Sequence, residues 1–112
     1  MSAKRFGAVY FDDTTKDTFQ TVMTGPAGMD RTAVISFCNQ TNGVGAISLA
    51  YTVDSTLTIP AQADYIVFYR TLRAYETIDI PALAVESGAR IIVHTNIAGV
   101  SVVAHGYQDA SL

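Results

Sequence analysis

The chain has 112 residues, a formal net charge of −3, 49% apolar residues and only 15% charged residues. This length fits one domain, residues 1–112, and the apolar content argues against a disordered chain. The seven cations are scattered and show no basic stripe, so we expect no nucleic-acid partner. No apolar run approaches the roughly 20 residues of a membrane span.

The composition favours strands and association. Eleven Val, nine Ile and thirteen Thr residues are β-branched, and such residues are enriched in strands. A weakly charged surface promotes association, so these numbers predict a small all-β protein that packs against neighbours. The N-terminus lacks the apolar segment of a signal peptide, which predicts synthesis in the cytoplasm without signal-peptide export.

Eight segments separated by turn signals read as short strands. They are residues 5–11, 18–23, 32–38, 45–53, 65–72, 77–80, 90–95 and 100–107. In the fourth segment, strict alternation places Ile47, Leu49, Tyr51 and Val53 inside, and Ala46, Ser48, Ala50 and Thr52 outside. This pattern predicts an all-β protein, an antiparallel β-sandwich or jelly roll of about eight strands.

Several connections between these strands can be predicted as well. Asn42-Gly43 is a strong hairpin signal, and residues 96–99 read as the short loop of a final hairpin. Pro81 is expected to end its strand, and residues 82–88 fit either a helical turn or a short strand with a turn. Residues 54–63 form the longest irregular stretch. Residues 1–4 and 108–112 are expected to be flexible arms.

No motif in the chain predicts catalysis. His94 and His105 would be diagonal neighbours on one face of the final hairpin, but two imidazoles do not make a zinc site. Cys38 reads as a small buried apolar residue, and the carboxylates Asp12, Asp13 and Asp17 as a solvated turn. A phosphate-binding loop and a nucleophile elbow are both missing. We therefore expect no enzyme, no metal and no cofactor.

The aromatic residues are the best candidates for contacts. On residues 65–72, alternation places Tyr65, Val67 and Tyr69 on one face, opposite a core-like face with Ile66 and Phe68. Most aromatic residues must fill the core, whereas an exposed row would stack on sugar rings or anchor an interface. The predicted interface residues are Tyr65, Val67, Tyr69, Arg70, Arg73 and Tyr75.

Nearly the whole chain resembles a family of small bacteriophage virion proteins. The resemblance lies in a pattern of strands and turns, with departures at Gly25-Pro26 and at Ala82. The segments that carry it are Lys4-Arg5-Phe6-Gly7-Ala8, residues 18–28, Ile35-Ser36-Phe37-Cys38-Asn39, residues 63–69, residues 76–88 and residues 99–106.

This resemblance implies a non-enzymatic β-sandwich located in the virion. Such a subunit decorates or cements the capsid shell, or belongs to the neck or tail. The expected partners are copies of the chain itself, with a trimer as the favoured homo-oligomer, and the major capsid or tail proteins. The alternative hypothesis is a carbohydrate-binding module of a short tail fibre that holds a host glycan through exposed tyrosines.

Overall fold

All eight predicted strands are present. The computed structural model describes residues 2–53 and 59–110, except for the side chains of residues 2, 3, 82 and 110. The strands are β1 (Ser2–Phe11), β2 (Gln20–Thr24), β3 (Met29–Asn39), β4 (Gly45–Thr52), β5 (Tyr65–Leu72), β6 (Thr77–Val85), β7 (Arg90–Thr95) and β8 (Val100–Ala110), with one 3₁₀ turn, η1 (Gln62–Asp64).

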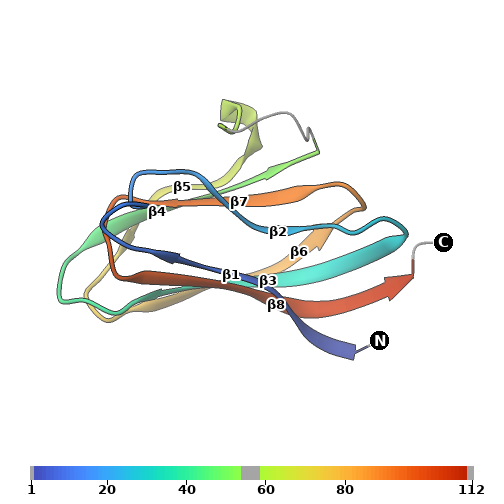
Figure 1. Ribbon diagram of the computed structural model, residues 1–112, viewed down its shortest axis with the longest axis horizontal. Coiled ribbons are helices and arrows are strands. Elements are labelled where there is room, and N and C mark those ends of the chain that lie inside the picture. Colours follow the sequence, from blue (N-terminus) through green and yellow to red (C-terminus); the bar gives the residue numbers. More distant parts are fainter. Residues whose placement is uncertain (1, 54–58, 111–112) are drawn as a thin grey trace.

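The strands form two four-stranded antiparallel sheets. Sheet A has the order β1-β8-β3-β6, and sheet B has the order β2-β7-β4-β5. Figure 1 shows them as two layers, with β1, β8 and β3 in the lower layer and β4, β5 and β7 in the upper one. Strand β1 pairs with β8, β2 with β7, β3 with β6 and β4 with β5, as when a chain folded into one long hairpin wraps around itself. This is the topology of a jelly roll, and it confirms the predicted fold class.

The predicted hairpins are wrong. Among the described strands, only β4 and β5 are both consecutive in the chain and paired. The Asn42-Gly43 turn carries the chain from β3 in sheet A to β4 in sheet B, and residues 96–99 carry it from β7 back to β8. Alternation identifies a strand from local sequence, whereas its partner depends on how the whole chain wraps.

Two predicted boundaries also need correction. Residues 2–4 and 108–110 are not arms, because Ser2 pairs with Gln108 and Met29 pairs with Ala110. Residues 1, 111 and 112 lie outside the described part of the chain. Pro81 does not end its strand, since β6 is a sheet edge whose pairing with β3 is irregular at this point. Proline has no N–H group to donate to a neighbouring strand. Sheet edges and bulges tolerate it because this hydrogen bond is not required there.

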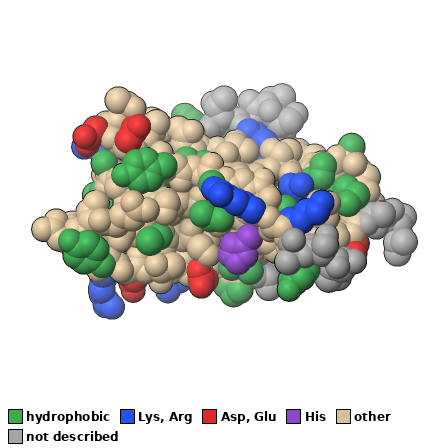
Figure 2. Space-filling view, turned by 60° about the horizontal axis from the view of Figure 1, so that its bottom comes forward, with side chains coloured by type: hydrophobic (Ala, Val, Ile, Leu, Met, Phe, Trp, Pro, Cys, Tyr) green, Lys and Arg blue, Asp and Glu red, His purple; other side chains and the backbone are tan. Residues whose placement is uncertain are grey.

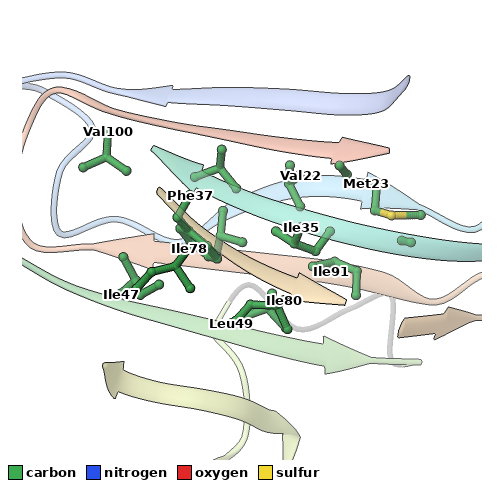
Figure 3. Close-up of a cluster of buried hydrophobic side chains, with 14 of the residues drawn as sticks. Val22, Met23, Ile35, Phe37, Ile47, Leu49, Ile78, Ile80, Ile91 and Val100 are labelled. Carbon is green, nitrogen blue, oxygen red and sulfur yellow. The ribbon is translucent and has the colours of Figure 1, made fainter. Parts of the chain in front are cut away.

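One hydrophobic core lies between the two sheets. Figure 3 shows Ile35 and Phe37 of β3 facing Ile47 and Leu49 of β4 and Ile91 of β7, and all five are fully buried. The inward placement of Ile47 and Leu49 is therefore confirmed.

The other face of β4 differs from the prediction. Ser48, Ala50 and Thr52 were expected to be exposed but are buried, while Val53 is 63% exposed just beyond the strand. Burial on both faces of β4 means that side chains also cover the outer face of sheet B.

Candidate functional site

Five rings cross the outer face of sheet B and form what we call the aromatic row: Phe19, His94, Tyr69, Phe68 and Tyr65. Successive ring centroids lie 5.0, 6.2, 4.9 and 4.9 Å apart in that order. The row starts just before β2, passes over β7 and ends on β5, so it runs across the strands. It crosses the outer side of β4 at Ser48 and Ala50, which pair with His94 and Tyr65.

A bulge in β5 turns two adjacent aromatic residues outward. Pairing with β4 shifts between Ile47 and Leu49, which leaves Phe68 and Tyr69 together opposite Ser48. Tyr69 adopts a left-handed backbone conformation with φ of 50°, and its N–H donates to Ser48 Oγ at 3.1 Å. Phe68 is consequently 64% exposed and Tyr69 is 55% exposed.

This bulge overturns the predicted faces of β5. Val67 pairs with Leu49 and packs against the core, whereas Ile66 and Phe68, predicted to be core-like, are exposed. A strictly alternating strand cannot place both Phe68 and Tyr69 on one face, but a bulged strand can.

The six predicted interface residues therefore do not share one face. Tyr65 and Tyr69 belong to the aromatic row, and Val67 points inward. The other three are exposed at the end of β5 and in the turn that follows it: Arg70, Arg73 and Tyr75. Sequence reasoning did not single out Phe19 and placed His94 beside His105 instead of in this row, since the segments that meet here are distant in the chain. The adjacent aromatic pair in β5 was the available sign of a bulge.

Polar groups flank the row at both ends. His94 is buried, and its Nε2 lies 3.9 Å from Oδ1 of Asp17, an exposed residue held at φ of 62°. At the other end, Gln62, Tyr65 and Phe68 line a pocket of about 340 Å³. Burial, and to a smaller extent the nearby Tyr69, raises the pKa of the Tyr65 hydroxyl.

The two histidines are not neighbours, contrary to the prediction. His94 lies in sheet B, and His105 is exposed on the outer face of sheet A. There Ser36 Oγ donates to Asp79 Oδ1 at 2.6 Å and lies 3.4 Å from His105 Nε2. A catalytic triad needs the serine proton to go to the histidine and the histidine to be oriented by the acid. Here the serine proton goes to the carboxylate, so this order does not activate the serine.

The same face of sheet A carries a broad surface that we call the sheet A platform. It consists of two rows of outward-facing residues paired across the four strands. They are Tyr10, Ser101, Cys38 and Thr77 in one row, and Ala8, Val103, Ser36 and Asp79 in the other. Cys38, expected to be buried, is half-buried here and free. Figure 2 looks onto this side and shows a histidine near the middle with cationic and acidic side chains beside it.

A second pocket, of about 420 Å³, lies at the ends of β3, β4 and β6. Arg31, which lines this pocket, has a structural role: its guanidinium donates to Thr24 O at 2.9 Å and to Gln108 Oε1 at 3.2 Å. It also lies 4.2 Å from the centroid of the Phe6 ring, and burial lowers its pKa. Arg31 therefore links β3 to Thr24 of β2, Gln108 of β8 and Phe6 of β1.

The acidic residues after β1 form an exposed turn, as predicted for Asp12 and Asp13. Asp12 Oδ1 accepts hydrogen bonds from the backbone N–H groups of Thr14 and Thr15, both at 2.9 Å, and from their hydroxyls. These bonds, led by the Thr14 hydroxyl, lower the pKa of Asp12 to about 2. The carboxylate thus closes the turn.

No family model, curated protein or solved structure matches this chain. Within residues 2–53 and 59–110, no three His, Cys, Asp or Glu side chains gather as metal ligands. The described part of the chain also holds no helix long and apolar enough to cross a membrane.

Proposed function

We propose that this protein is a non-enzymatic structural subunit of a bacteriophage particle. It decorates or cements the capsid shell, or forms part of the neck or tail, through contacts with its own copies and with major capsid or tail proteins. The resemblance of the sequence supports this role. The jelly roll is compatible with it, since viral capsid proteins use this fold, but lectins and cupins use it too.

The sheet A platform is the observation that carries the proposal. Its eight positions include one charged residue, Asp79, and no lysine. Most of its side chains are small, which allows a neighbouring subunit to approach closely. Interface cores are depleted in charge because each buried charge must lose its water. The platform meets this requirement over the width of a whole sheet.

The geometry also suits a ring of subunits. A platform on one side of each subunit can contact a different surface of its neighbour, and such head-to-tail contacts close into a ring when the rotation permits. Arg70, Arg73 and Tyr75 remain predicted contact residues because all three are exposed. We propose a homo-oligomer, with a trimer as the smallest ring of this kind.

A charge placed in the platform tests the proposal. Val103 lies in its middle and is partly exposed, and Thr71 is an exposed position on β5 of sheet B. In analytical ultracentrifugation, we expect the wild-type protein and Thr71→Asp to sediment as oligomers, and Val103→Asp to sediment as a monomer. Circular dichroism and unfolding curves establish that both variants are folded.

Binding to purified bacteriophage capsids and tails forms the second arm of this experiment, with electron microscopy locating the bound protein. The proposal is refuted if the wild-type protein is strictly monomeric and binds neither capsids nor tails. If Val103→Asp remains an oligomer, the platform is not the interface between the subunits.

A further inference from the structure

We propose that the aromatic row and the adjoining Gln62 pocket form a binding site for a saccharide, with a neutral hexopyranose unit as the group recognised. This inference does not depend on the virion role. The row lies on sheet B, whereas the proposed subunit contacts lie on sheet A.

The lining of the pocket matches the chemistry of a sugar. A pyranose has C–H groups on its faces and hydroxyl groups around its rim. Tyr65 and Phe68 offer apolar ring surface, and the Gln62 amide offers both hydrogen-bond donors and an acceptor. Ligand sites are usually concave and mostly apolar, with a few polar groups, and about 340 Å³ lies within the range for small molecules.

The backbone of Tyr69 points to a ligand as well. A bulky residue at φ of 50° is held in a strained conformation that costs about 1–2 kcal/mol relative to an ordinary one. More than half of its surface is nevertheless exposed, so core packing does not repay the strain. Strain of this kind concentrates at ligand and partner sites. Here it presents a tyrosine ring next to Phe68, on the path from the pocket to His94.

The charges near the row favour a neutral sugar over a nucleic acid. Aromatic platforms also stack nucleic-acid bases, but they do so beside a basic groove that follows the phosphates. Asp17 lies beside His94 near one end of the row, and Asp64 directly precedes Tyr65 at the other end; both are acidic. Arg70 pairs opposite the inward-facing Ile47, on the other side of β5 from the row.

Nuclear magnetic resonance titration tests the site directly. The probes are the methyl glycosides of glucose, galactose, mannose and N-acetylglucosamine, together with purified bacterial O-polysaccharide. With at least one probe, we expect saturable shifts at residues 17–19, 62–69 and 94. Phe68→Ala and Tyr69→Ala should each weaken binding at least about tenfold, because each removes a ring that the sugar contacts.

Tyr107→Ala is the matched control, because Tyr107 is a tyrosine about as exposed as Tyr69 but lies on sheet A. It should bind the probe as the wild type does. The inference is overturned if no probe gives saturable shifts, if the shifts fall elsewhere, or if Phe68→Ala keeps its affinity. It is also overturned if Phe68→Ala dissociates an oligomer, since the row would then be a subunit interface. None of these results alters the outcome of Val103→Asp on the opposite sheet.

Discussion

The left-handed conformation of Tyr69 leads to a stability prediction of unusual sign. In an ordinary strand, glycine is less stable than alanine by about 0.5–1 kcal/mol, because the unfolded chain gains more freedom. At φ of 50°, alanine keeps a strain of about 1–2 kcal/mol that glycine does not have. Both replacements lose the same ring contacts, which cancel in the comparison. Tyr69→Gly should therefore be more stable than Tyr69→Ala, by up to about 1.5 kcal/mol.

Thr71 gives the matched control in the same strand. It is exposed, pairs regularly with Ala46 and is absent from the residues with positive φ. Thr71→Ala should thus be more stable than Thr71→Gly by about 0.5–1 kcal/mol. Subtracting the two comparisons removes the glycine entropy and leaves the left-handed strain, about 1–2 kcal/mol.

Urea unfolding of the four variants, followed by circular dichroism and extrapolated linearly to water, measures these differences. The reasoning fails if alanine is the more stable residue at both positions, because Tyr69 would then carry no strain. Tyr69→Gly should also lose saccharide binding despite its relieved backbone. That result would show that the strained backbone at Tyr69 serves to place the tyrosine ring where it contacts the saccharide.

Three further predictions concern the fold. A Cβ at Gly106 would meet the backbone carbonyl of Thr32, so Gly106→Ala should lower the free energy of unfolding by several kcal/mol, measured by calorimetry. The control is Gly28→Ala, where the Cβ meets nothing within 4 Å but φ is +76°; it should lower the free energy of unfolding by only about 1 kcal/mol. Phe37→Ala empties a fully buried position and should destabilise by about 3–5 kcal/mol in urea unfolding; a loss under 1 kcal/mol would contradict the packing described. The pKa of Asp12, about 2 when folded, lies below its unfolded value, so its contribution to stability is complete above pH 4 and is lost as the pH falls toward 2. Asp12→Asn should flatten this dependence, and a carboxyl that titrates near pH 4 by NMR would refute it.

The strands could be predicted because alternation is local, but their partners could not. Every pairing except that of β4 with β5 joins segments that are not consecutive, and each of these depends on how the whole chain wraps. His94 and His105 illustrate the consequence: the chain changes sheets between them, at a loop where Gly99 has φ of 86°. Part of the site was predictable, since Tyr65 and Tyr69 stand out in the sequence. Phe68 was placed on the wrong face because a bulge shifts the alternation by one residue.

The two proposed surfaces also constrain how the subunit would sit in a particle. The sheet A platform and the aromatic row lie on opposite outer faces of the sandwich, with the core between them. Where a neighbour meets the platform with a surface other than the row, the row of that neighbour faces solvent. Oligomerisation would then place several weak saccharide sites on one assembly, and linked sites raise avidity without any new contact. A platform with a single charged residue on sheet A and strained exposed rings on sheet B would thus have complementary roles: the platform holds the subunit in place, and the rings contact a surface glycan.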